Sequence, residues 1–178
     1  MDPVHWLTPE QEREIYDLHD NDPDDPGYQR FLSRLATPLL DRLPEGSRGL
    51  DFGCGPGPAL ARMMEAAGMR VSLYDPFFHP EPTVLDQCYD FVACTEVVEH
   101  LHRPHEVFLE LNRLMKPGGW LGVMTCFQTD DSKFANWHYR RDPTHVVFYR
   151  EATMAWLADS LGWTMEVPVK DVVLFRKP

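Results

Sequence analysis

Three glycines at alternate positions are the strongest chemical signal in this sequence. Gly53, Gly55 and Gly57 follow the short run LDF at 50–52, and a segment of helical periodicity begins directly after them. Where a strand ends in such a loop and a helix begins, backbone amides can approach a ligand that side chains would otherwise displace. The pattern therefore predicts a nucleotide-like cofactor bound at this loop.

Two acidic residues indicate what kind of cofactor this loop would bind. Asp51, two residues before the first glycine, is a poor neighbour for a pyrophosphate but a good one for an ammonium or sulfonium group. Pro58 stands where the dinucleotide fingerprint requires a small residue, so NAD is disfavoured. Asp75 closes the next expected strand, where an acid accepts hydrogen bonds from ribose hydroxyls. A cationic cofactor with a ribose is expected.

The elements that position these residues are expected to alternate between strands and helices. Apolar periodicity predicts strands over 49–52, 69–74, 89–94, 120–127, 163–167 and 171–176, and helices over 9–18, 28–43, 59–67, 105–115 and 150–161. We expect Pro38, with Thr37 as cap, to bend or restart the second helix. This order predicts an α/β, Rossmann-like, doubly wound sheet that is mostly parallel and ends in an antiparallel hairpin.

Four motifs occur in one order along the chain: LDFGCGPG at 50–57, Asp75, YDFVACTEVVEHL at 89–101 and LMKPGGW at 114–120. In these motifs the chain resembles the class I S-adenosylmethionine-dependent methyltransferases, over roughly residues 48–127. The resemblance implies S-adenosylmethionine as cofactor, S-adenosylhomocysteine as product and a small-molecule substrate. Only thirteen residues, rich in proline, separate Asp75 from Tyr89. We therefore expect the family's third strand and its preceding helix to be shortened or absent.

The resemblance also implies roles for individual residues. Asp51 and the backbone of Gly53, Cys54, Gly55 and Gly57 would face the methionine part of the cofactor. Asp75 would bind the ribose, and Pro76 with Phe77 would flank the adenine. Thr95 and Glu96 would line the reacting methyl group, although Glu96 could equally be a solvated loop acid or a helix cap.

Two segments lack the periodicity of the rest of the chain. The segment 1–27 is rich in Asp and Pro, so we expect an acidic N-terminal arm ahead of a single domain over 28–178. The first part of that domain, 28–47, is expected to form a helical cover. The segment 128–146 is expected to be a long lid loop on the substrate side, at the carboxyl edge of the sheet.

The lid loop carries side chains suited to substrate binding and proton transfer. Trp137 and Tyr139 offer stacking surfaces, and Arg140 and Arg141 could pair with a carboxylate or phosphate. The candidates for removing a proton from the acceptor are His100, His138 and His145. The alternative is a surface loop pinned by buried aromatic residues and an Arg–Asp pair.

No metal site is expected from the sequence. His100, His102 and His105 are closely spaced, but three ligands spread over one helix start rarely converge without flanking acids, and Pro104 interrupts their geometry. The four cysteines are isolated, without a Cys-x-x-Cys pair, which supports neither a zinc knuckle nor a disulfide framework. Reduced and mostly buried thiols are expected.

Length and composition limit the classes of protein that this chain can represent. The 178 residues correspond to one domain, and 43% apolar residues are sufficient for a packed core. The net charge of −11 makes duplex nucleic acid an unlikely partner. No apolar run is long enough to span a membrane, and no basic-then-apolar leader is visible, so a cytoplasmic protein is expected.

The activity expected from these observations is methyl transfer from S-adenosylmethionine to a small polar or anionic acceptor. An in-line displacement at a sulfonium carbon mainly requires that donor and acceptor be aligned and water excluded. The alternative is a regulatory or interaction module that binds S-adenosylmethionine or S-adenosylhomocysteine without turnover. The sequence indicates no oligomeric state.

Overall fold

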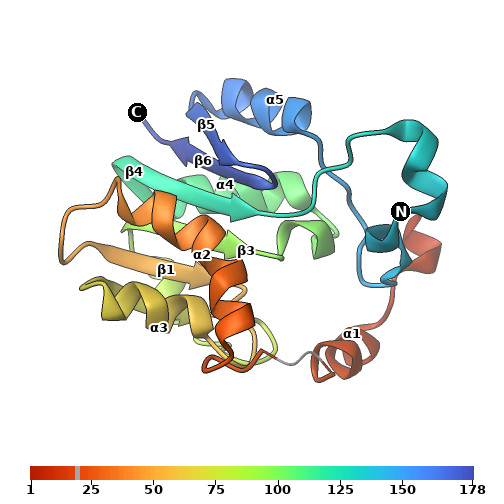
Figure 1. Ribbon diagram of the computed structural model, residues 1–178, viewed down its shortest axis with the longest axis horizontal. Coiled ribbons are helices and arrows are strands. Elements are labelled where there is room, and N and C mark those ends of the chain that lie inside the picture. Colours follow the sequence, from red (N-terminus) through yellow and green to blue (C-terminus); the bar gives the residue numbers. More distant parts are fainter. Residues whose placement is uncertain (19–20) are drawn as a thin grey trace.

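The computed structural model describes residues 1–18 and 21–178. Its centre is a six-stranded sheet with the strand order β2-β1-β3-β4-β6-β5 (Figure 1). The strands are β1 (Arg48–Phe52), β2 (Arg70–Tyr74), β3 (Tyr89–Thr95), β4 (Met115–Met124), β5 (Thr164–Val169) and β6 (Val172–Arg176). Strands β1 to β4 pair in parallel, and β6 pairs antiparallel with both β4 and β5. The predicted mostly parallel sheet with an antiparallel C-terminal hairpin is confirmed.

The third strand of the usual doubly wound sheet is missing, as predicted. Residues 75–88, all within the described chain, form an isolated bridge between Asp75 and His79 and a 3-10 turn over Pro82–Asp86. Because three prolines fall within so short a connection, neither a helix nor a paired strand can be completed there. Strand β2 is therefore an edge of the sheet.

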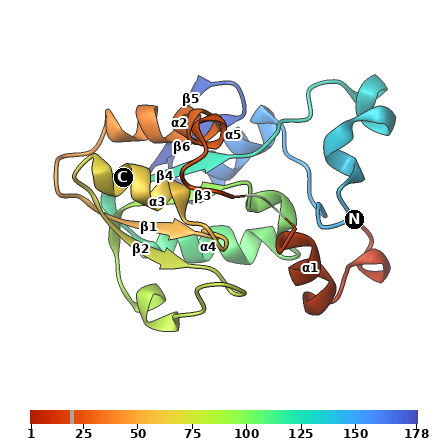
Figure 2. The ribbon, with the colours of Figure 1, turned by 60° about the horizontal axis from the view of Figure 1, so that its bottom comes forward.

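Two pairs of helices cover the two faces of the sheet (Figure 2). Helices α2 (Pro26–Leu40) and α3 (Ala59–Ala66) pack on one face, and α4 (Pro104–Leu114) and α5 (Glu151–Leu161) on the other. Within β3 the side chains alternate accordingly, with Phe91 in the core beneath α2 and α3 and Val92 in the core beneath α4 and α5. Both faces are buried, so the central strands are almost continuously apolar.

The expected restart of the helix at Pro38 with Thr37 as cap is wrong, and so are the expected bounds of the fourth strand. Helix α2 continues through Pro38 instead of restarting there, and the guanidinium of Arg42 donates to the Pro38 carbonyl. Pro38 lies in the last turn, where buried Leu35 and Leu39 hold the helix against the sheet despite one missing amide. Strand β4 begins at Met115 rather than 120 and ends at Met124 rather than 127, because its register against β3 shifts around its proline.

The N-terminal arm lies against the loops that follow the carboxyl ends of the strands (Figure 2). Its helix α1 (Pro9–Tyr16) begins with a capping box between Thr8 and Gln11. The Trp6 ring stacks on His102 with 4.2 Å between ring centroids. Arg13 Nη1 donates to the Phe77 carbonyl over 2.9 Å. These contacts bring the arm to the same edge of the sheet as the glycine loop.

The segment 128–146 contains two 3-10 turns, Asp131–Asn136 and His138–Arg141, in place of an entirely irregular loop. None of the helices in the described residues is long and apolar enough to cross a membrane. Cys54, Cys88, Cys94 and Cys126 are all free thiols. Only Cys94 is buried, so the expectation of mostly buried thiols is wrong.

Candidate functional site

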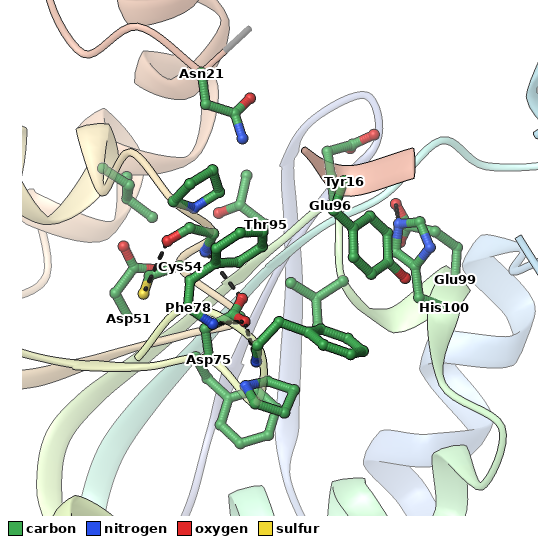
Figure 3. A pocket seen from close by; sticks show the side chains of 18 of the residues that line it. Tyr16, Asn21, Asp51, Cys54, Asp75, Phe78, Thr95, Glu96, Glu99 and His100 are labelled. Atoms are coloured by element: carbon green, nitrogen blue, oxygen red, sulfur yellow. Dashed lines mark hydrogen bonds and ion pairs between the residues drawn. The ribbon is translucent and has the colours of Figure 1, made fainter. Parts of the chain in front are cut away.

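A cavity of about 660 Å³ opens at the carboxyl ends of β1, β2 and β3 (Figure 3). The loops that follow these strands, 51–57, 74–78 and 95–97, form one side of it. The rest of the lining comes from the N-terminal arm, helices α2, α3 and α4, the segment 99–102 and the end of the lid loop. Its size is typical of a pocket for a small molecule or cofactor.

The backbone conformation and the close packing of the loop require glycine at particular positions. Gly53 and Gly55 adopt φ angles of +77° and +64°, which side-chain-bearing residues rarely take. A Cβ on Gly53 would lie 2.4 Å from Cγ2 of Val97, and one on Gly57 would lie 2.3 Å from the Asn21 carbonyl oxygen. The loop therefore packs too closely against Val97 and the arm to carry side chains at Gly53 and Gly57, and it lines the cavity.

The carboxylate of Asp75 holds the glycine loop and the following turn together. Its Oδ2 accepts the amide of Gly55 over 3.0 Å, and its Oδ1 accepts those of Phe77 and Phe78 over 2.8 and 3.1 Å. A carboxylate has about four acceptor positions, so one remains for a ligand hydroxyl. Asp75 and the neighbouring Pro76 both line the cavity, where the resemblance expected the ribose and adenine.

Asp51 is a buried carboxylate at the end of β1, with only 4% of its surface exposed. It accepts the amide of Ala61 in the first turn of α3, whose N-cap residue, Pro58, offers no side-chain acceptor. Burial raises the pKa of Asp51 to about 7. No Arg or Lys is among the described residues that line the cavity. A bound cation would therefore complement this carboxylate.

At the end of β3, two carboxylates share one phenol. Glu96 adopts a left-handed φ of +51°, with its amide donating to the Met124 carbonyl over 2.8 Å. The Tyr139 hydroxyl lies 3.1 Å from Glu96 Oε2 and closer still to Glu99 Oε1, and Thr125 donates to Glu99 Oε2 over 2.9 Å. Burial, reinforced by the negative charge of Glu99, raises the pKa of Glu96 to about 8. Burial therefore favours a protonated carboxyl group in this corner of the cavity.

The three histidines proposed for proton transfer do not lie together. His100 and His145 both line the cavity, with 4.7 Å between their ring centroids. His138 is exposed and lies outside the cavity-lining residues. Of the other two histidines in the 100–105 cluster, His102 contacts the arm, 3.1 Å from Glu12 Oε1, and His105 is exposed on α4.

The four expected substrate-binding residues also lie outside the cavity lining. Arg140 donates to the Ala135 carbonyl and lies over the Phe134 ring, and Arg141 is exposed. Trp137 packs beside Phe134 and Phe148. Tyr139 is buried and contacts the site through Glu96, Glu99 and His145. The nine expected cofactor-binding residues line the cavity without exception: Asp51, Gly53, Cys54, Gly55, Gly57, Asp75, Pro76, Thr95 and Glu96.

Several cavity residues carry no signal that the sequence analysis used. Tyr16 and Asn21 come from the arm, and Glu99 is completely buried beside His100 (Figure 3). The clue to Glu99 was its position beside His100, at the same sheet edge as the lid loop. The arm offered no comparable clue, because its contacts depend on tertiary structure.

Replacing both Arg140 and Arg141 by Ala should leave the affinity for S-adenosylhomocysteine within about twofold of the wild type. Neither side chain reaches the cavity, and Arg140 is engaged with the loop itself. Titration calorimetry of the double variant measures this directly. A marked loss of affinity would mean that the loop closes over the cofactor.

Comparison with known proteins agrees with this architecture. A model of a methyltransferase domain family matches residues 26–166. A search of curated proteins gave no significant match. The fold is similar to that of a Pyrococcus horikoshii protein, with a TM-score of 0.63 at 15% identity over 93% of this chain and 98% of the other.

Two further solved structures share the fold. The first is the 1,6-didemethyltoxoflavin-N1-methyltransferase of Burkholderia thailandensis, with its substrate and S-adenosylhomocysteine bound (TM-score 0.62, 16% identity, 96% of this chain and 91% of that one). The second is a Haloferax volcanii methyltransferase in complex with a methyltransferase activator (TM-score 0.60, 15% identity, 92% and 97%). The family model covers most of the chain, and the chain therefore belongs to the methyltransferase domain family, as a class I S-adenosylmethionine-dependent enzyme.

Proposed function

We propose that this protein transfers the methyl group of S-adenosylmethionine to a small polar acceptor by in-line displacement. The observation that carries the proposal is the division of one cavity into two chemically different ends. Asp51, the glycine loop and Asp75 form one end, and Glu96, His100 and His145 border the other. When bound, S-adenosylmethionine supplies a methyl group activated by a sulfonium charge.

The residues at the first end fit this cofactor. The glycine loop lines this end of the cavity, and Asp51 provides the negative charge that a sulfonium or ammonium group requires. Asp75 retains an acceptor position for a ribose hydroxyl, and Pro76 offers an apolar surface beside it. A pyrophosphate would lie beside the carboxylates of Asp51 and Asp75 here, with no Lys or Arg among the described cavity-lining residues, which disfavours NAD.

The second end of the cavity suits a small polar acceptor. Glu96 lies where β3 ends, between the cofactor residues and the two imidazoles of His100 and His145. These imidazoles are the basic groups available to an acceptor that must lose a proton. Arg140 and Arg141, on which an anionic acceptor depended, do not line the cavity. The protein's main task is to align the acceptor and exclude water.

Calorimetric titration with S-adenosylmethionine, S-adenosylhomocysteine and NAD tests the cofactor assignment. We expect micromolar binding of the first two and none of NAD. Formation of S-adenosylhomocysteine on incubation with a fractionated small-molecule extract would then identify the acceptor. Cofactor binding without turnover on any fraction would favour the non-catalytic module, and absence of cofactor binding would overturn both.

A further inference from the structure

We propose that Glu99, His100 and His145 form a binding site for a divalent transition-metal ion at the acceptor end of the cavity. One potential ligand atom from each residue lies within 4.8 Å of the other two. Glu99 and His100 belong to the 3-10 turn Val98–His100 that follows β3, whereas His145 comes from the end of the lid loop. The fold thus brings His145 to Glu99 and His100, although His145 lies 46 positions after Glu99 in the sequence.

Both imidazoles are held in the orientation that a metal site requires. His100 Nδ1 lies 3.2 Å from the Thr144 carbonyl oxygen, and His145 Nδ1 lies 2.6 Å from that of Tyr139. A carbonyl can only accept, so each Nδ1 carries the proton and each Nε2 carries the lone pair. Backbone carbonyls that fix the tautomer in this way are the usual outer partners of metal-binding histidines.

Hydrogen bonds also fix the orientation of the Glu99 carboxylate. It is completely buried, and its two oxygens accept hydrogen bonds from Thr125 and Tyr139. Each oxygen has a second lone pair available to an ion. His100 Nε2 lies 3.9 Å from Glu99 Oε1, so the imidazole and the carboxylate already face one another.

The charge around the cluster also favours a cation. Glu96 shares the Tyr139 hydroxyl with Glu99, and Asp142 Oδ2 lies 4.0 Å from His145 Nε2. Among the described residues that line the cavity, none is Lys or Arg. Buried carboxylates without a compensating positive charge are costly. A divalent ion would supply that charge.

The donor set of two imidazole nitrogens and one carboxylate oxygen suits Zn²⁺, Mn²⁺ or Fe²⁺ better than Mg²⁺ or Ca²⁺. Bonds of roughly 2.0–2.2 Å require the ligand atoms to approach one another by about an ångström on binding. Three protein ligands leave a coordination position open, as in catalytic metal sites.

The open position has a consequence for the acceptor, which rests on the proposed function. An ion here would bind and orient a hydroxyl or carboxylate oxygen of the acceptor beside Glu96. It would also provide the positive charge that the cavity walls lack. His100 and His145 would then act as metal ligands rather than as proton acceptors.

The test is direct metal binding to the full chain after treatment with EDTA and dialysis. Calorimetry with Mn²⁺ and the absorption spectrum with Co²⁺ are measured on the wild type, Glu99→Gln, His145→Asn and the control His105→Ala, whose imidazole is exposed on α4. Circular dichroism and S-adenosylhomocysteine affinity verify the fold of each variant. We expect one ion per chain in the wild type and control, and binding weaker by about tenfold or more in the two ligand variants.

Three results would overturn the site: no binding to the wild type, unchanged affinity in folded ligand variants, or a Co²⁺ spectrum with a thiolate band. The last would place the ion on a cysteine, and it decides the question even if a ligand variant does not fold. Metal and cofactor are titrated separately, so failure of the metal site leaves the proposed methyl transfer standing. Loss of cofactor binding in the wild type would instead overturn the proposed function.

Discussion

Asp75→Ala should lose cofactor affinity and fold stability together. Removal of this carboxylate leaves the amides of Gly55, Phe77 and Phe78 without their acceptor. Hydrogen bonds to a charged group contribute roughly 1.5–3 kcal/mol each, and water can replace part of that loss. We expect about 3 kcal/mol of destabilisation and a roughly 100-fold loss of affinity for S-adenosylhomocysteine. Urea denaturation and calorimetry measure the two effects.

Two further variants separate the roles of Asp75. Asp159→Ala removes an exposed aspartate from α5 and should change neither quantity. Asp75→Asn keeps an oxygen for Phe77 and Phe78 but presents an NH₂ group to the Gly55 amide. It should retain much of the stability while losing most of the affinity. Normal affinity in Asp75→Ala would show that the glycine loop keeps its shape without this residue.

Asp51→Asn should stabilise the unliganded protein above pH 7 and weaken cofactor binding. The carboxyl group ionises near pH 4 in the unfolded chain and at a pKa of about 7 in the fold, where burial opposes its charge. Unfolding therefore releases a proton between these values, and this group's contribution to stability is lost as the pH rises from 4 to 7. Three pKa units correspond to roughly 4 kcal/mol. Asparagine removes this dependence.

The difference in unfolding free energy between Asp51→Asn and the wild type isolates this group from every other titration. It should be small at pH 4 and grow to favour the variant by pH 8. Affinity for S-adenosylmethionine at pH 8 should fall tenfold or more, since the variant lacks the negative charge that faces the cationic ligand. A difference in unfolding free energy that does not change with pH would show that folding does not raise the pKa of Asp51.

The local part of the site could be predicted from the sequence. Gly53 and Gly55 adopt positive φ angles that favour glycine, so their residue type indicates the turn. Asp75 follows a strand whose position the apolar pattern predicts. The absence of the third strand could also be predicted, because the length and the proline content of the connection are read directly from the sequence. The helix was expected to restart at Pro38, but it continues through this residue because its packing on the sheet outweighs local propensity.

The non-local part of the site could not be predicted. His145 and Glu99 meet only because two loops leave the same sheet edge, and no spacing rule relates them. Arg140 and Arg141 lie in the predicted loop, but side-chain direction depends on the 3-10 turn that the loop forms. The arm docks through Trp6 on His102, a contact between residues 96 positions apart.

The position of the arm couples the release of the cofactor to the release of the acceptor. Asn21 lies over Gly57 at the cofactor end, and Tyr16 packs edge-on against His100 at the acceptor end, with 5.4 Å between ring centroids. Two residues of the arm, Tyr16 and Asn21, thus line the two ends of the cavity. If the arm moved away from His102 and Phe77, both the cofactor end and the acceptor end of the cavity would open to solvent together. Departure of the spent cofactor and of the methylated product would then be governed by one shared opening rate.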